Sequence, residues 1–273
     1  RAAASPRSVS TQSQTSAAPP AFCRWHATPT SAGISELLTG GCPRFSDPLV
    51  KWGMGIRCLN TGQLALLVGL LPVVAINLSY VIAAAAGTVP ACIPYIDGCT
   101  SISATGRQPP ASWLFKPALY ASALAMGVFW LRAGRWLTSL GEPSRRYRLV
   151  LLWVGVIGAL ALVVYVYNLG IAGDMYKLMR RYGINIYFGF TFLAQLLLAN
   201  RLYRLAESAG NKALFVIARA MIGLCLLLLI IGLYSIPARY FIADHTVMER
   251  VLEWNFALLM HGWFFLAWLG WKK

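Results

Sequence analysis

Residues 224–233 read LCLLLLIIGL, and this apolar stretch decides the fold class. It belongs to a longer apolar run over about residues 213–235. Strands of a membrane β-barrel alternate apolar and polar residues, and this run does not, so it predicts a membrane-spanning helix. The whole chain is 58% hydrophobic and only 12% charged, whereas soluble domains carry about 25% charged residues. The sequence therefore predicts an integral membrane protein.

Working outward from this run, we find that each long apolar segment comes close to the roughly 20 residues that cross a bilayer. Charged residues, glycine or proline bound each of them. The predicted fold class is an all-α integral membrane protein, a bundle of six transmembrane helices with a folded first outward loop. The predicted spans are about 63–87, 113–133, 148–168, 184–203, 213–235 and 251–271.

The membrane domain is predicted to cover residues 54–273, because the composition changes sharply at Met54. Residues 1–53 are rich in Ser, Ala, Pro and Thr and contain no run long enough to span, which indicates a disordered or non-native leader. The leader has three interpretations: translated sequence upstream of a start at Met54, a native tail, or a transit peptide. We favour the first, because a processed presequence rarely joins its membrane domain at a new Met-Gly.

The distribution of basic residues predicts the orientation. Cytoplasmic loops of membrane proteins carry an excess of Lys and Arg, and here the excess lies on the side of both termini, which we therefore expect in the cytoplasm. This bias accounts for much of the formal charge of +15 without nucleic acid. A bacterial cytoplasmic membrane is the favoured location and a eukaryotic endomembrane the alternative. The basic loop after the second span could bind a cytoplasmic protein partner through Arg132, Arg135, Arg145, Arg146 and Arg148.

The first outward loop contains two cysteines, Cys92 and Cys99, on either side of a segment with the turn-forming pair Asp97-Gly98. A disulfide is chemically permitted on the non-cytoplasmic side and would stabilise so short a loop by about 2.5 kcal/mol. The alternative is two free thiols. The disulfide is favoured and would give a rigid cap over the end of the bundle.

The same loop carries a resemblance to a known family. Pro94-Tyr95-Ile96, residues 105–110 (TGRQPP) and Leu114-Phe115 resemble the outward-loop signature of the Frag/DRAM/Sfk-like membrane proteins. The resemblance extends over residues 60–271 and includes Glu253 at the start of the last span. That family includes the damage-regulated autophagy modulators and the GPI-anchor lipid-remodelling factor, and it is similar to the amino-terminal half of the cell-wall protein that installs ceramide on GPI anchors. The resemblance implies six spans and membrane lipid handling, and it implies no defined catalytic mechanism.

Two departures from the family pattern are visible. Residues 97–104 are inserted within the loop signature, and Asn185 lies in the fourth span where a histidine is expected. Because of these departures, the activity of a particular family member is not assigned to this chain.

Polar residues inside membrane spans are costly and therefore mark candidate sites. The midplane set comprises Asn77, Gln195 and His261. An outer set, expected to bind a lipid headgroup together with the loop, comprises Asp97, Arg107, Asn168, Asp174, Arg180, Asn185, Glu253 and Asn255. The alternative for each residue is a simple hydrogen bond to a neighbouring helix, and for Glu253 an ion pair with Arg250 one helical turn away.

No catalytic motif, cofactor-binding pattern or metal-ligand spacing is recognisable. Glu253 and His261 are the only candidates for a general base, and neither has an identifiable nucleophile beside it. We therefore expect a lipid-handling protein that binds a headgroup in an outward-facing polar cavity, without cofactor, metal or nucleic acid. The alternatives are a membrane scaffold that recruits a cytoplasmic partner through its basic loop and, third, a small-solute transporter.

Overall fold

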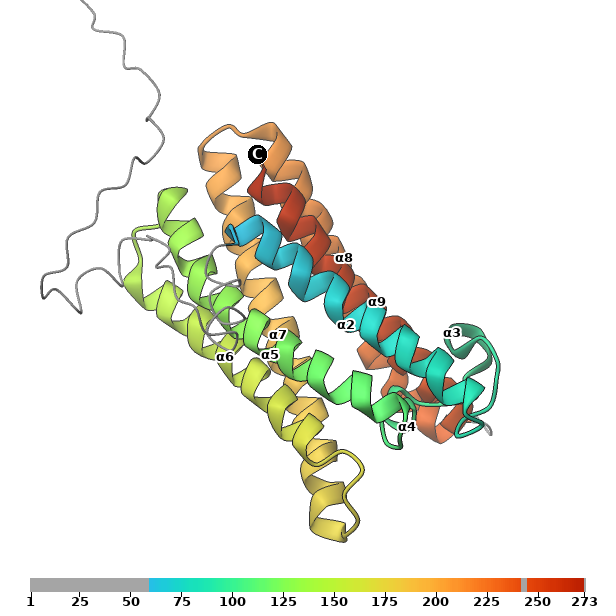
Figure 1. Ribbon diagram of the computed structural model, residues 1–273. Coiled ribbons are helices and arrows are strands. Elements are labelled where there is room, and N and C mark those ends of the chain that lie inside the picture. Colours follow the sequence, from blue (N-terminus) through green and yellow to red (C-terminus); the bar gives the residue numbers. More distant parts are fainter. Residues whose placement is uncertain (1–58, 242–244, 273) are drawn as a thin grey trace, which may run out of the picture. The chain divides into compact units, whose positions relative to one another are not determined.

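The computed structural model describes residues 59–241 and 245–272, apart from the side chains of residues 236–245 (Figure 1). The predicted leader lies outside the described residues. Within them, every regular element is a helix. The long helices are α2 Thr61–Ala85, α5 Ala111–Ser139, α6 Arg145–Tyr167, α7 Asp174–Ser208, α8 Lys212–Phe241 and α9 His245–Trp271. Two short helices, α3 Pro94–Asp97 and α4 Ile102–Thr105, lie in the connection between α2 and α5.

Each long helix packs against the next one in the chain, and α9 returns to pack against α2, which closes a ring. The core of this ring is aromatic: Phe129, Trp130, Trp263 and Phe264 are fully buried and pack edge to face or tilted. Gly155 makes room for this core, because a Cβ there would lie 2.2 Å from Cγ of Trp130. The sequence prediction of an α-helical membrane bundle is thereby confirmed.

In the described part of the chain, five helices are long and apolar enough to cross a membrane: α2, α5, α6, α7 and α8. Helix α9 is long enough and closes the ring, but Asn255, His261 and several tryptophans lower its hydropathy. The sixth span therefore stays a prediction that rests on the length and packing of α9.

Each long helix begins before its predicted apolar run, and α5, α7 and α8 also end after it. The largest difference is in α7, which begins at Asp174, whereas the fourth span was predicted to begin at residue 184. Hydropathy identifies only the part of a helix that can lie in the hydrocarbon core of the membrane. In α7, helical backbone hydrogen bonding also includes the polar turns that precede this apolar part. With 35 residues, α7 is about 52 Å long, which exceeds a hydrocarbon core of about 30 Å.

Residues 86–110, here called the disulfide loop, connect α2 to α5 and lie at one end of the bundle, with α3 and α4 (Figure 1). We call this the loop end. Since the long helices alternate in direction, the first turn of α9 and the last turns of α2 and α6 also lie there. The connections α5–α6 and α7–α8 lie at the opposite end.

Candidate functional site

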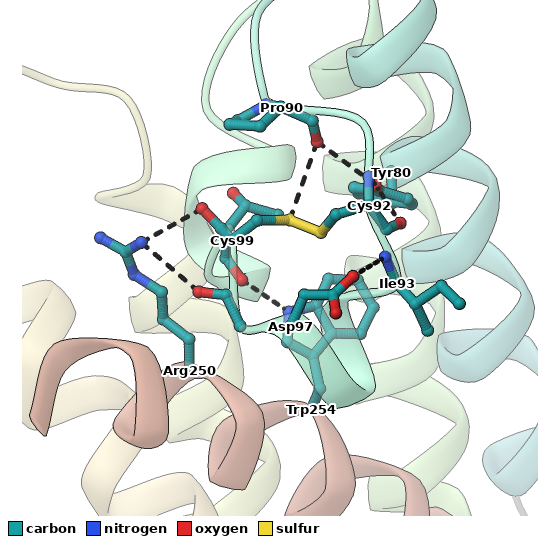
Figure 2. Close-up of a disulfide and its surroundings, with 10 residues drawn as sticks. Tyr80, Pro90, Cys92, Ile93, Asp97, Cys99, Arg250 and Trp254 are labelled. Atoms are coloured by element: carbon teal, nitrogen blue, oxygen red, sulfur yellow. Dashed lines mark hydrogen bonds between the residues drawn. A yellow bond between two sulfur atoms is a disulfide. The ribbon is translucent and has the colours of Figure 1, made fainter. Parts of the chain in front are cut away.

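The predicted disulfide between Cys92 and Cys99 is present (Figure 2). It encloses α3, whose first turn is capped by its own acid: the backbone N–H of Ile93 donates to Oδ2 of Asp97 at 2.8 Å. Asp97 is exposed and serves the loop's own fold. The helix ends at Gly98 with a φ of 58°, which favours glycine.

Helix α2 holds one side of the disulfide loop. The hydroxyl of Tyr80 accepts the backbone N–H of Cys92 at 2.7 Å and donates to the carbonyl of the same residue at 2.7 Å (Figure 2). One turn earlier, Nδ2 of Asn77 donates to the hydroxyl of Tyr95 at 2.9 Å. Asn77, predicted at the membrane midplane, thus binds the loop.

Helix α9 holds the other side through side chains that bind loop carbonyls. Nη1 of Arg250 donates to the carbonyl of Cys99 at 3.1 Å, and the indole N–H of Trp254 donates to the carbonyl of Thr100 at 2.9 Å (Figure 2). Trp254 is fully buried. Because these bonds are made to backbone carbonyls, they fix the position of the loop backbone against α9.

Two further α9 residues, Asn255 and Glu253, complete the contact. Nδ2 of Asn255 donates to the carbonyl of Tyr95 at 2.8 Å. The carboxyl group of Glu253 lies close enough to the backbone N–H groups of Ile102 and Ser103, at the start of α4, to interact with them. Both residues belong to the predicted headgroup set, and both bind the loop backbone.

A cavity lies beneath the loop, inside the loop end of the bundle. It holds about 370 Å³ of empty space when the part open to solvent is included. Every long helix except α8 contributes to its wall, and Ile102 of α4 contributes from the loop. The lining residues are Pro72, Ile76, Ile102, Leu119, Leu162, Tyr165, Ile184, Tyr187, Phe188, Glu253, Ala257 and His261.

The polar groups of this cavity are few and mostly paired. Nδ1 of His261 lies 2.7 Å from the carbonyl of Ala257, and Nε2 lies 3.2 Å from the hydroxyl of Tyr187. A carbonyl can only accept, so the proton is assigned to Nδ1, and the hydroxyl of Tyr187 donates to Nε2. Tyr187 and His261 are both buried, and with Glu253 and Tyr165 they are the polar residues of an otherwise apolar wall.

A second, smaller cavity of about 210 Å³ adjoins the first. The two share Ile76, Ile102, Ala257 and His261 as lining residues. The smaller one adds Asn77, Tyr95 and Trp254, among others, so the disulfide loop is part of the wall of both cavities.

Two of the predicted basic residues lie near the larger cavity. Arg107 and Arg180 are, like Glu253, close enough to Tyr165 to interact with it electrostatically. Arg107 is exposed and Arg180 partly buried. The backbone of Arg107 also contacts the α6–α7 connection, because a Cβ at Gly170 would lie 2.8 Å from its carbonyl oxygen. The structure thus brings together Arg107, Arg180, Glu253 and His261 from the predicted set.

Other predicted residues lie elsewhere. Asp174 is fully exposed at the start of α7 and forms an ion pair with Lys177 at 3.0 Å. Asn185 is exposed, and Nδ2 of Asn168 donates to the carbonyl of Val164 at 2.6 Å. Nε2 of Gln195 donates to the carbonyl of Met260 at 2.8 Å and thereby joins α7 to α9.

Sequence reasoning did not single out Tyr165 and Tyr187. A tyrosine within an apolar run is as typical of the core as of a functional site. Only its proximity to Glu253 or His261 in the folded chain marks it as a site residue. The partner of Tyr187 is 74 residues away in the chain.

The comparisons with known proteins agree with the loop signature. No curated protein and no solved structure gives a significant match. Residues 60–273 match the family described as Frag1/DRAM/Sfk1/Cwh43P N-terminal domain. This match covers α2 to α9 together with the disulfide loop. The chain is therefore a multi-pass membrane protein that belongs to the Frag1/DRAM/Sfk1/Cwh43P N-terminal domain family.

Proposed function

We propose that this protein binds a membrane lipid at its loop end, with part of a hydrocarbon chain in the larger cavity and the headgroup at Arg107 and Arg180. The observation that carries the proposal is the cavity itself, an apolar space with a small polar group of Glu253, Tyr187 and His261 under an ordered loop. Sites for small ligands combine apolar walls with a few placed polar groups in this way.

The position of the headgroup follows from the cost of burying charge. A phosphate inside an apolar cavity would lose its hydration without adequate compensation. Arg107 is exposed and Arg180 partly exposed, so a phosphate there would keep contact with water and gain charge-assisted hydrogen bonds. We therefore place the headgroup at the rim of the cavity. The sequence had led us to expect it inside an outward-facing polar cavity.

The experiment is lipid analysis of the protein purified from native membrane, comparing wild type with two variants. Leu162→Trp fills the cavity, and Arg107→Ala with Arg180→Ala removes the proposed headgroup contacts. We expect the first variant to lose its co-purified lipid and the second to lose lipids with anionic headgroups. Arg181→Ala is the matched control, because Arg181 is exposed on the same helix. Identical lipid profiles for wild type and both variants would refute the proposal.

A second candidate function rests on the opposite end, where exposed arginines could recruit an acidic cytoplasmic partner. Arg148 donates to the carbonyl of Glu142 at 2.7 Å and Arg132 to the carbonyl of Leu59, so these two serve the fold. Arg135, Arg145 and Arg146 are exposed and available to a partner. Replacing these three with Gln should abolish the capture of a cross-linked partner, while Arg181→Gln should not. Unchanged capture would reject this function.

A further inference from the structure

We propose that the disulfide loop inserts into the membrane at its short helix α3, where Ile93 and Ile96 contact the acyl chains of the lipid leaflet at the loop end. The partner is the bilayer surface, and this contact is separate from the proposed lipid cavity. Three features of the loop support it: the exposure of the two isoleucines, the depth at which the loop binds α2 and α9, and the pairing of its backbone polar groups.

Helix α3 and the residue before it carry two apolar side chains on their outer surface. Ile93 is 57% exposed and Ile96 is 72% exposed. Between them, Tyr95 turns inward and packs edge to face on Trp254, with ring centroids 5.1 Å apart. A single exposed isoleucine is ordinary on a protein surface. Here, however, both belong to a ring of residues closed by the disulfide, which gives a fixed apolar surface.

The loop binds α2 well inside the end of that helix. Tyr80, which binds the backbone of Cys92, lies five residues before the last residue of α2, about 8 Å along its axis. Asn77, which binds the hydroxyl of Tyr95, lies eight residues before it, about 12 Å along the axis. Beyond these contacts α2 remains apolar, and Val81 is 60% exposed. Lipid must cover this last apolar part of α2, so α3 lies at a depth that acyl chains reach.

Helix α9 gives a consistent depth. Asn255, whose side chain binds the carbonyl of Tyr95, lies ten residues after the first residue of α9 and within the predicted sixth span. The polar side of the loop lies nearer the loop end, where Arg250 binds the carbonyl of Cys99 and Asp97 is exposed. This is the arrangement of an interfacial segment, whose apolar face enters the boundary between headgroups and acyl chains by about 5–10 Å while its charges stay in the headgroup layer.

A segment at this depth needs paired backbone groups, because lipid cannot hydrogen-bond to them. The backbone N–H of Cys92 donates to the hydroxyl of Tyr80. That of Ile93 donates to the carboxyl group of Asp97, and Pro94 has no N–H group. Side chains of α9 bind the carbonyls of later loop residues. The hydrogen bonds that hold the loop against the bundle therefore also suit it to an apolar environment.

The test measures the collisions of a nitroxide with oxygen, which concentrates in hydrocarbon, and with a water-soluble nickel chelate. The purified full-length protein is placed in phosphatidylcholine nanodiscs, and the nitroxide is attached at Ile96 through p-acetylphenylalanine, which adds no thiol near the disulfide. Val81 on α2 is the lipid-facing reference, and Asp174, with a side chain 97% exposed, is the water-facing one. We expect the ratio of oxygen to nickel collisions at Ile96 to match that at Val81 and to exceed that at Asp174 severalfold.

Hydroxyl-radical footprinting of the wild type in the same nanodiscs needs no substitution. Leu178 is the reference, because leucine and isoleucine react with hydroxyl radicals at similar rates and Leu178 lies in the polar turns at the start of α7. Ile96 is more exposed than Leu178, 72% against 45%. In water Ile96 should therefore be modified at least as strongly as Leu178. In lipid we expect Ile93 and Ile96 to be modified severalfold less than Leu178.

Each outcome has a defined meaning. A high oxygen-to-nickel ratio at Ile96, with both isoleucines protected from radicals, supports insertion into lipid. Frequent nickel collisions at Ile96, or modification of Ile96 at least equal to that of Leu178, would overturn it. Low collision rates with both reagents would show that protein covers Ile96, and this would overturn it as well. Because these measurements do not involve the cavity, they leave the proposed lipid site to its own experiment.

Discussion

The carboxyl group of Glu253 on α9 lies within interaction range of the backbone N–H of Ile102 at the start of α4. Ile102 in turn lines both cavities. One α9 side chain therefore contacts the segment of the disulfide loop that covers the cavity.

Removing this carboxyl group should loosen α4 without unfolding the bundle. Hydrogen bonds to charged groups contribute about 1.5–3 kcal/mol, so Glu253→Ala should speed amide hydrogen exchange around residues 102–105 by roughly tenfold or more. Glu253→Gln keeps one acceptor oxygen and should give a smaller increase. Exchange in the core of α5, around the buried Phe129, is the internal control. Unchanged exchange in α4 would show that Glu253 does not hold the loop.

The disulfide should contribute to stability independently of the hydrogen bonds from α9. Replacing Cys92 and Cys99 with Ser should lower the free energy of unfolding by about 2.5 kcal/mol, because the unfolded chain loses a covalent constraint. Thermal unfolding in detergent, with and without reductant, measures this. Reductant should lower the Tm of the wild type and leave that of the double-serine variant unchanged. An equal effect of reductant on both proteins would assign the loss to another cause.

Local features of the sequence were sufficient to predict the helices and the disulfide. Each apolar run is recognisable by itself, and Cys92 and Cys99 are separated by a short segment with a turn-forming pair. The cavity was not predictable in the same way, because it depends on contacts between residues far apart in the chain, such as Tyr187 with His261. Glu253 was singled out from the sequence as a polar residue at the start of a predicted span, but its contacts with the loop backbone depend on a loop conformation that no local pattern specifies.

The orientation of the bundle remains a prediction with a direct test. We expect the loop end to face away from the cytosol, because the opposite end carries the basic α5–α6 connection. After reduction, a membrane-impermeant maleimide should label Cys92 and Cys99 in intact cells. A cysteine introduced at the exposed Arg135 should be labelled only after permeabilisation. The reverse pattern would place the proposed lipid site on the cytosolic side and remove the basis for the second candidate function.

The opposite end is stabilised by a buried acid. Glu142 is fully buried at its side chain and pairs with Arg201 of α7, and its Oε1 accepts the backbone N–H of Ser144 at 2.8 Å. Arg201→Ala would leave the carboxylate buried without its partner, a change that costs about 3–5 kcal/mol for a fully buried pair. Because Arg201 is partly exposed, we expect the free energy of unfolding to fall by about 3 kcal/mol or less. Thermal or SDS-induced unfolding measures this loss.

The double variant Arg201→Ala with Glu142→Gln provides the control for this prediction. It removes the unpaired charge and should recover part of the stability lost in Arg201→Ala. Strictly additive losses in the two single variants and the double variant would show that the pair is not coupled.

Two glycines in the loop region allow the effect of close packing on the loop's position to be measured separately from the effect of backbone strain. Gly87 and Gly98 both have a positive φ, 69° and 58°, so Ala at either position meets a similar conformational cost of roughly 1 kcal/mol. A Cβ at Gly98 would also lie 2.3 Å from the carbonyl of Val247 on α9, whereas a Cβ at Gly87 has nothing within 4 Å. Gly98→Ala should therefore displace the loop from α9, and Gly87→Ala should not. Hydrogen exchange of the disulfide loop in the two variants measures the difference, and equal protection in both would mean that the close contact with α9 does not hold the loop in place.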